Sequence, residues 1–281
     1  MGGAKPIERL RDLIDSFETA RGAKPVGPFI FRGQRANWTL KTSLELACER
    51  METGANPLAR ALEHEAYFLR EFQRRAHHYL SDLPSPQHKL EWLALMRHHG
   101  APSRLLDSTY SIYVATYFAI QHSESDKDAD AAIWMFDRDW CFKEAARLAT
   151  QATHGGANLL PPTTYENEEQ KASILLSEHT PFRCVSPVNP FRLNERLTIQ
   201  RGVFLVPGDV SHSFEENLNT MPKQDANVTK FLIPRKSFRA ISVELHSMNV
   251  SEATLFPGLD GYARSLIAAR RFIDDQRPAS S

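Results

Sequence analysis

The sequence has few cysteines, no long apolar run and no excess of charge of either sign, and each absence excludes a class of protein. Its three cysteines, Cys48, Cys141 and Cys184, lie far apart without a Cys-x-x-Cys pair, so neither a disulfide framework nor a cysteine zinc site is expected. The 281 residues include 34 basic and 34 acidic ones, a balance that argues against binding to nucleic acid or membranes through bulk charge.

Targeting segments and the common catalytic motifs are also missing. The longest mostly apolar run, 112–120, is too short to span a bilayer, and the N-terminus shows no secretory apolar region. We therefore expect a cytoplasmic protein that does not contact membranes. The absence of Gly-x-Ser-x-Gly, P-loop, Gly-x-Gly-x-x-Gly and His-Glu-x-x-His motifs excludes the usual hydrolase, NTPase, dehydrogenase and zincin families. His98 and His99 would face apart on a helix, so no metal site is expected.

The residues that are present favour a mixture of helices and short strands. Helical spacing predicts helices over 6–21, 57–80, 86–99, 112–119, 140–149, 236–247 and 259–274. Short apolar runs predict strands over 28–33, 103–107, 131–136, 203–206 and 229–234. Residues 151–170 are expected to form a long loop, a kind of segment that often serves as a lid. Because strands and helices do not alternate regularly, the fold class is α+β.

Helix ends and buried positions follow from the same patterns. Ser85 is expected to cap the helix that starts at Pro86, and Gly100 to end it. The strand at 103–107 is expected in the middle of a sheet, because so short an apolar run implies burial on both faces. The expected core includes Phe31, Leu105, Leu106, Val114, Ala115 and Phe118.

Two polar segments stand at the ends of predicted strands. In Phe31-Arg32-Gly33-Gln34, the guanidinium of Arg32 could lie in water or hold a phosphate or carboxylate through two charge-assisted bonds. Gly33 would let the backbone turn sharply and approach a ligand. In Asp107-Ser108-Thr109, one side chain could cap the next helix, or the free N–H groups of that helix could bind phosphate. The segments 200–204 and 254–262, taken alone, are most simply a helix end and a packed turn.

Together these segments resemble the FRG domain family, which is named for its Phe-Arg-Gly motif. Residues 31–34 match that motif, and residues 92–119 resemble the central block of the family. The segments 200–204 and 255–261 resemble its two C-terminal blocks. The sequence departs from the family at Ser108, where tryptophan is usual. The resemblance divides the chain into an N-terminal helix at 1–25, an FRG-like domain at 26–268 and a C-terminal tail at 269–281.

A second resemblance, to ADP-ribosyltransferases of the Arg-Ser-Glu type, implies a fold of short mixed sheets wrapped by several long helices. In this match Arg32 is similar to the arginine of the first strand, and Ser108-Thr109 to the Ser-Thr of the second. Gln200 takes the first position of the Gln-x-Glu pair, but Gly202 stands where the catalytic glutamate belongs. Glu195 or Asp209 could substitute for that glutamate, Gln200 could serve with less effect, or the pocket could bind without turnover.

The resemblance implies a function as well as a fold. The protein would use NAD as a substrate to modify a protein or nucleic-acid acceptor, as toxins and phage-defence components do. The implied catalytic residues are Arg32, Thr109 and Gln200. The implied nucleotide-binding residues are Arg32, Gly33, Gln34, Arg104, Asp107, Ser108 and Thr109. The alternatives are a module that binds a nucleotide or a partner without turnover, and a purely structural role. Both functional hypotheses require Arg32, Asp107, Thr109 and Gln200 to converge on one cleft.

Overall fold

The computed structural model describes residues 6–24, 29–121, 129–152, 168–177, 182–192 and 194–266. Within these ranges the strands form one six-stranded sheet in the order β4-β5-β2-β1-β3-β6, and every neighbouring pair is antiparallel. The strands are β1 (Phe29–Gln34), β2 (Leu106–Thr109), β3 (Ala131–Asp137), β4 (Val185–Val188), β5 (Gly202–Pro207) and β6 (Val228–Ile233). The α+β class is confirmed, whereas the expectation of short mixed sheets is wrong because one antiparallel sheet takes their place.

The sheet consists of two three-stranded halves that meet at a narrow seam. Strands β1, β3 and β6 are paired over six residues at each contact, and β2, β5 and β4 over four. By contrast, β1 and β2 are paired at one position, where Phe31 lies opposite Thr109. We call this junction the seam.

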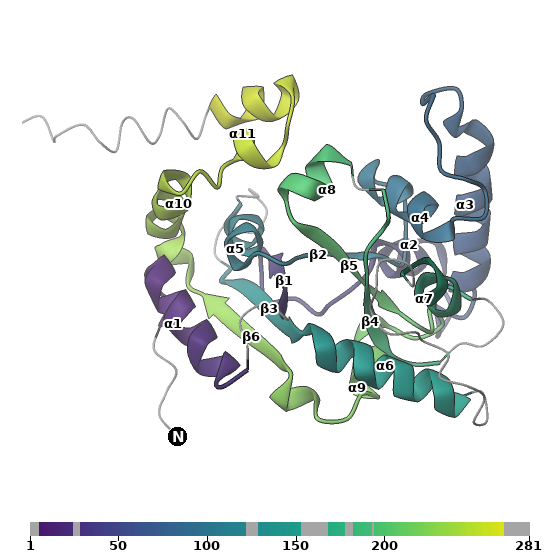
Figure 1. Cartoon of the computed structure of the whole chain (residues 1–281), viewed down its shortest axis with the longest axis horizontal. Coiled ribbons are helices and arrows are strands. Elements are labelled where there is room, and N and C mark those ends of the chain that lie inside the picture. The colour runs from purple at the N-terminus through teal and green to yellow at the C-terminus, as the bar shows by residue number, and fades with distance from the viewer. Residues whose placement is uncertain are drawn as a thin grey trace, which may run out of the picture.

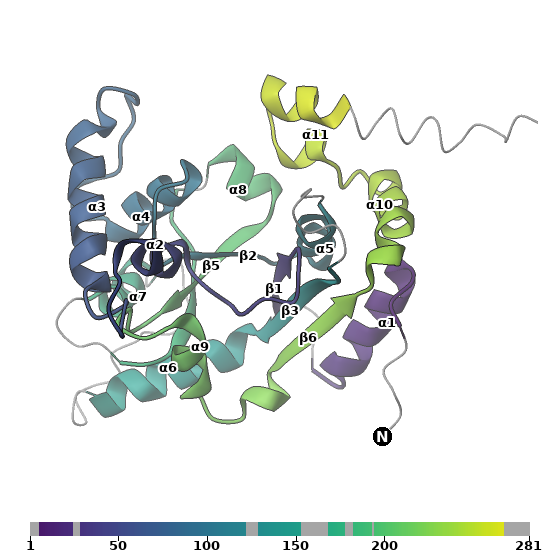
Figure 2. The ribbon, with the colours of Figure 1, turned by 180° about the vertical axis from the view of Figure 1, so that it is seen from behind.

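Helices on one side of the molecule cover the β1-β3-β6 half. They are α1 (Leu10–Arg21), α5 (Ile112–Ile120) and α10 (Phe238–Ser247), and Figures 1 and 2 show α1 and α10 beside β6. Their apolar faces form one buried cluster with strand residues such as Phe29, Phe31 and Ile133. Because side chains alternate along a strand, Ile30 lies on the other face, in a second cluster.

The second cluster fills the space between the β2-β5-β4 half and the remaining large helices. These are α3 (Ala61–Ala76), α4 (Lys89–His98), α6 (Arg138–Ala152), α7 (Glu168–Leu175) and α9 (Phe214–Asn219), with α2 (Ser43–Met51) packed on α3. Short helices α8 (Glu195–Ile199) and α11 (Glu252–Leu255) stand together at one end of the molecule (Figure 1). Two 3-10 turns, Gln224–Ala226 and Arg235–Ser237, flank β6. None of the described helices is long and apolar enough to cross a membrane.

Most of the predicted elements are present, but several boundaries differ. Helix α1 ends at Gly22, whose φ of 58° lies in the left-handed region, and α4 is followed by Gly100 with φ 81°. Ser85 does not cap α4, which begins at Lys89 after a turn. The segment 259–274 is helical from 259 to 266, and its remainder lies outside the described residues.

Helices α2 and α9 and strand β4 have no counterpart among the predicted elements. Both ends of the segment predicted as a long loop, 151–170, are helical, because α6 runs to residue 152 and α7 starts at residue 168. Residues 153–167 lie outside the described part of the chain, and with them the prediction of a lid.

The central position of β2 is confirmed, and Leu105 and Leu106 are almost completely buried, with 1% and 2% of their surface exposed. Phe31, Val114 and Ala115 are also buried, as expected. Phe118 is not a core residue, because its ring is half-buried and lies at a cavity described below. Strand β2 begins later than predicted and carries the Asp-Ser-Thr cluster within it.

Gly33 lies inside β1, opposite Ile133, and is not the turn residue that the sequence suggested. Its role is to let α5 approach the strand closely. A Cβ atom at this position would lie 1.9 Å from the carbonyl oxygen of Ala115 and 2.8 Å from the backbone nitrogen of Ala119. The missing side chain therefore sets the distance between β1 and α5, and with it the position of Phe118 beside Arg32.

Candidate functional site

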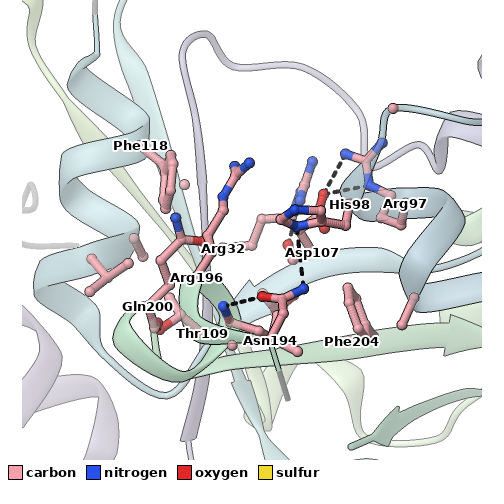
Figure 3. A pocket seen from close by; sticks show the side chains of 18 of the residues that line it. Arg32, Arg97, His98, Asp107, Thr109, Phe118, Asn194, Arg196, Gln200 and Phe204 are labelled. Atoms are coloured by element: carbon pink, nitrogen blue, oxygen red, sulfur yellow. Dashed lines mark hydrogen bonds and ion pairs between the residues drawn. The ribbon is translucent and has the colours of Figure 1, made fainter. Parts of the chain in front are cut away.

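A large cavity opens at the seam of the sheet. Its volume is about 910 Å³, and its lining comes from β1, β2 and β5 together with α4, α5 and α8. Arg32, Asp107, Thr109 and Gln200 all line it, so residues up to 168 positions apart in the sequence do converge on one cleft. In the view of Figure 3, Arg32 stands between Phe118 and the pair formed by Arg97 and Asp107. The cavity is the candidate site.

Arg32 presents a guanidinium that has no carboxylate partner among the described residues. Its Nη1 atom donates a hydrogen bond to the backbone carbonyl oxygen of Asp107, across the seam. Its Nε atom is buried and has no hydrogen-bond partner in the described part of the chain. Burial lowers the pKa of Arg32 to about 10, while the Asp107 carboxylate acts to raise it and Arg97 to lower it. The group remains charged at neutral pH, and a half-buried cation of this kind favours an anionic ligand.

The Asp107 carboxylate is paired with Arg97 instead of Arg32. Arg97 donates to Asp107 Oδ2 from Nε at 2.7 Å and also from Nη2. The Asp107 side chain is 47% exposed, so the carboxylate reaches the cavity from β2. Arg97 comes from the last turn of α4, where the helix dipole also favours a basic residue.

The hydroxyl groups of Thr109 and Ser108 form hydrogen bonds with backbone atoms of the protein. Thr109 Oγ1 donates to the backbone carbonyl of Gln200 at 2.7 Å and accepts from the backbone N–H of Ser111 at 3.0 Å. Ser108 Oγ donates to the carbonyl of Leu106 at 3.3 Å. None of Asp107, Ser108 and Thr109 caps α5. The cap is Ser111, whose side chain accepts from the N–H of Val114.

Gln200 and Gly202 lie at the junction of α8 and β5. The side-chain amide of Gln200 donates to the carbonyl oxygen of Leu255 at 2.9 Å, so it ties the start of β5 to α11. Gly202 is paired with Thr109 in the sheet, and a Cβ there would meet Leu197 Cδ1 at 2.3 Å. Glycine at this position therefore leaves room for the Leu197 side chain of α8 against β5.

Two of the other expected site residues belong to the cavity and one does not. Gln34 lines it and is buried, with its side chain accepting from Trp134 Nε1 at 2.8 Å and donating to the carbonyl of Thr39 at 3.2 Å. Gly33 also lines it. Arg104 lies elsewhere, in a fully buried pair with Glu65 in which Nε contacts the two carboxylate oxygens at 2.7 and 2.9 Å. Arg104 therefore does not line the cavity, and its donors hold α3 to the segment that leads into β2.

Neither acid proposed as a substitute for the missing glutamate reaches the cavity. Glu195 is exposed on α8, and Asp209 lies beyond the far end of β5, where it contacts Ser211 and His212. The carboxylates that line the cavity are those of Asp82, Glu91 and Asp107. The first two lie near Arg192, at 3.1 and 4.0 Å. Asp107 is therefore the carboxylate that stands beside Arg32.

The motifs did not reveal Arg97 or Arg196, which both line the cavity. A signal for Arg196 existed, because it precedes Gln200 by four residues and so shares its helix face. No group of three or more histidine, cysteine or acidic side chains in the described ranges could hold a metal ion. The three cysteines are buried and unpaired, and burial raises the pKa of Cys48 to about 11, so it is not a nucleophile at neutral pH.

The family model of the FRG domain matches residues 27–128, so this stretch of the chain is similar to that family. The match includes β1, β2, α4 and α5, and thus Arg32, Arg97 and Asp107. The wall formed by α8 and β5, with Arg196, lies outside it. No curated protein and no solved structure matches the chain significantly.

Proposed function

We propose that the cavity binds a nucleotide and that Arg32 holds one of its phosphate groups. The observation that carries this proposal is the guanidinium of Arg32, which faces the cavity without a carboxylate partner among the described residues and with a buried, unpartnered Nε. Phosphate accepts two parallel hydrogen bonds from an arginine fork, which would satisfy this nitrogen and neutralise the charge.

The size and lining of the cavity support a nucleotide over a bare anion. Its volume of about 910 Å³ is at the upper end of the range of ligand sites. Phe118 and Trp38 line it, and the Trp38 side chain is 46% exposed, so aromatic surface is available to a base. NAD is the nucleotide that we propose first, because the arrangement of Arg32 on β1 and Ser108-Thr109 on β2 follows the resemblance to ADP-ribosyltransferases.

ADP-ribosyl transfer is a second candidate function, and the position of Asp107 favours it. In this reaction the bond between nicotinamide and the ribose carbon breaks, and its electron pair leaves with nicotinamide. An acceptor nucleophile then forms a bond to that carbon and loses its proton to water. The half-exposed Asp107 carboxylate could stabilise the positive ribose, a kind of contribution typically worth about 10²–10³ in rate. The acceptor, and a role as a toxin or in phage defence, rest on the resemblance alone.

Incubation of the purified protein with labelled NAD tests both candidates. Binding is measured by titration calorimetry, and turnover by the release of free nicotinamide and by label on protein or nucleic acid from a lysate. Saturable binding without nicotinamide release supports the binding function, and release that is lost in Asp107→Asn supports transfer. The absence of binding for NAD, ADP-ribose and ADP would overturn the proposal.

Replacement of Arg32 tests the phosphate contact directly. We expect Arg32→Ala to weaken nucleotide binding about tenfold to hundredfold, the loss of one charge-assisted hydrogen bond or pair. Its melting temperature should fall only slightly, because the variant loses one hydrogen bond, to the carbonyl of Asp107, and leaves no carboxylate without its partner. Arg32→Lys should restore part of the affinity, since an ammonium cannot reproduce the bidentate fork.

A matched control is Arg138→Ala, which removes an exposed arginine paired with Asp139 outside the cavity. It should bind like the wild type. A large drop in the melting temperature of Arg32→Ala with unchanged binding would assign Arg32 a structural role and contradict the proposal.

A further inference from the structure

Arg196 is a second arginine of the cavity without an ion pair. It lies on α8 and is half-buried, and within the described ranges its guanidinium has neither a hydrogen bond nor a carboxylate within ion-pair distance. Its contact is with an aromatic ring, because its Cζ atom lies 4.5 Å from the centroid of Phe256. Stacking of this kind leaves the N–H groups at the edge of the guanidinium plane available to an acceptor.

Arg32 and Arg196 line the same cavity, the first from β1 and the second from α8. Burial lowers the pKa of both arginines, and the Asp107 carboxylate acts to raise it in each. Five arginines (Arg32, Arg35, Arg97, Arg192 and Arg196) and three acidic residues (Asp82, Glu91 and Asp107) line the cavity, which leaves a formal excess of two positive charges. A monoanion would neutralise this excess only in part.

Phe256 holds Arg196 in place from outside the cavity. Its ring packs edge-on against Phe118 of α5 at 5.9 Å, so it links the walls formed by α5 and α8. The neighbouring carbonyl of Leu255 accepts the hydrogen bond from Gln200. The segment 255–256 is therefore held by contacts with Gln200 and with Phe118, and it positions the Phe256 ring against which the Arg196 guanidinium packs.

We propose that the ligand of this cavity carries a diphosphate, that Arg32 and Arg196 each hold one phosphate, and that Phe256 positions Arg196. The inference rests on the proposed nucleotide-binding function and specifies its ligand class. Two arginines on opposite sides of the seam, β1 and α8, would contact the two phosphates separately. The second phosphate is then the feature that the site recognises beyond a nucleoside monophosphate.

Titration calorimetry of the full chain with ADP, AMP and adenosine tests this proposal. The wild type should bind ADP about tenfold to hundredfold more tightly than AMP, and adenosine least. Arg196→Gln should bring the affinity for ADP down to that for AMP while leaving the AMP affinity nearly unchanged. Pyrophosphate and inorganic phosphate should show the same difference without the base.

Arg264 offers a matched control for the role of Phe256. It also lies over the Phe256 ring, at 5.4 Å, but it is paired with Glu252 at 2.8 Å and does not line the cavity. Arg264→Gln should keep the full preference for ADP, whereas Phe256→Leu should lose most of it and Phe256→Tyr should retain it. Far-ultraviolet circular dichroism and melting of each variant establish that it is folded.

The outcomes separate this inference from the function on which it rests. An unchanged ADP-to-AMP ratio in folded Arg196→Gln, with binding still dependent on Arg32, overturns the diphosphate assignment alone. Binding that does not depend on Arg32 overturns the proposed function as well. A ratio that falls equally in Arg264→Gln and Phe256→Leu shows that the aromatic contact acts through general packing, and it overturns the positioning role of Phe256.

Discussion

Glu45 is a buried carboxyl group outside the cavity, with 4% of its surface exposed. It is the third residue of α2 and forms a capping box with Thr42, and its Oε1 atom also accepts the backbone N–H of Phe214 at the start of α9, at 3.0 Å. Its Oε2 atom is buried without a partner in the described part of the chain. Burial raises the pKa of Glu45 to about 7, against the opposing hydrogen bonds from Thr42 and Phe214.

This raised pKa makes stability depend on pH in a defined direction. Below about pH 4.5 the Glu45 carboxyl group is protonated in the folded and in the unfolded chain, so its titration does not change the free energy of unfolding. As the pH rises to about 7, the unfolded chain loses the proton and the folded chain keeps it, so the free energy of unfolding falls by up to about 3 kcal/mol. Glu45→Gln keeps the Oε1 acceptor and removes the titration, so it should be more stable than the wild type at pH 8.

Urea denaturation at pH 4.5 and pH 8 measures this effect as the difference between wild type and variant. Glu63→Gln is the control, because Glu63 is an exposed member of an ion pair with Arg60. Its stability should follow the wild type at both pH values. Equal pH dependence of Glu45→Gln and wild type would exclude Glu45 as the titrating group.

Single residues of the site could be predicted where a motif coincides with the end of a predicted strand. Arg32, Asp107 and Gln200 were expected at the cavity and line it. The pairing of Arg104 with Glu65 could not be predicted, because the two residues are 39 positions apart and nothing local in the sequence indicates it. The hydroxyl of Thr109 is occupied for the same reason, since its acceptor is a backbone carbonyl 91 residues later.

At the scale of elements, the packing of α5 on β1 depends on the absence of a side chain at Gly33. An alanine Cβ there would meet backbone atoms of Ala115 and Ala119, which cannot move away as a flexible side chain could. We expect Gly33→Ala to lower the free energy of unfolding by about 1–3 kcal/mol or more, which exceeds the gain of about 0.4–1 kcal/mol from a stiffer unfolded chain.

Gly54→Ala is the matched control for this prediction, because a Cβ at Gly54 would meet no atom within 4 Å. Its free energy of unfolding, measured in urea, should equal or slightly exceed that of the wild type. If Gly33→Ala proves as stable as Gly54→Ala, the close approach of α5 does not depend on glycine.

The elements that the sequence revealed have a clear apolar pattern, such as the helical spacing in α1 and the apolar runs in α5 and β3. Strand β4 was missed because Pro187 stands within its four residues, and proline argues against a strand. The structure places β4 at an edge of the sheet, where proline is tolerated. Helices α2 and α9 are short, and their signal was a capping box, Thr42 with Glu45 and Ser213 with Glu216.

At the scale of the whole molecule, the strand order could not be predicted from the sequence. Strands β1 and β2 come early in the chain but occupy the middle of the sheet, between β3 and β5. Such pairings are decided by tertiary packing over long sequence separations, and periodicity carries no information about them. The convergence of the site could be expected only through the resemblance to known families.

The seam gives a prediction at this scale, which rests on the proposed function. A ligand held by Arg32 from β1 and by Arg196 beyond β2 would join the two halves of the sheet. Saturating ADP should therefore slow amide hydrogen exchange in β1 and β2 most, with little change in β6, the far edge strand. Protection spread evenly over all strands, or confined to one half, would contradict the bridging role, and Arg32→Ala should show no protection.

The two halves of the sheet are joined at one paired position, where Phe31 of β1 lies opposite Thr109 of β2. The Arg32 side chain adds a second connection between the halves, because it extends from β1 and donates a hydrogen bond to the carbonyl of Asp107 on β2. A ligand that draws Arg32 away from this carbonyl replaces the hydrogen bond between the strands with a contact to the ligand. The connection between the two halves of the sheet is therefore coupled to the occupancy of the cavity.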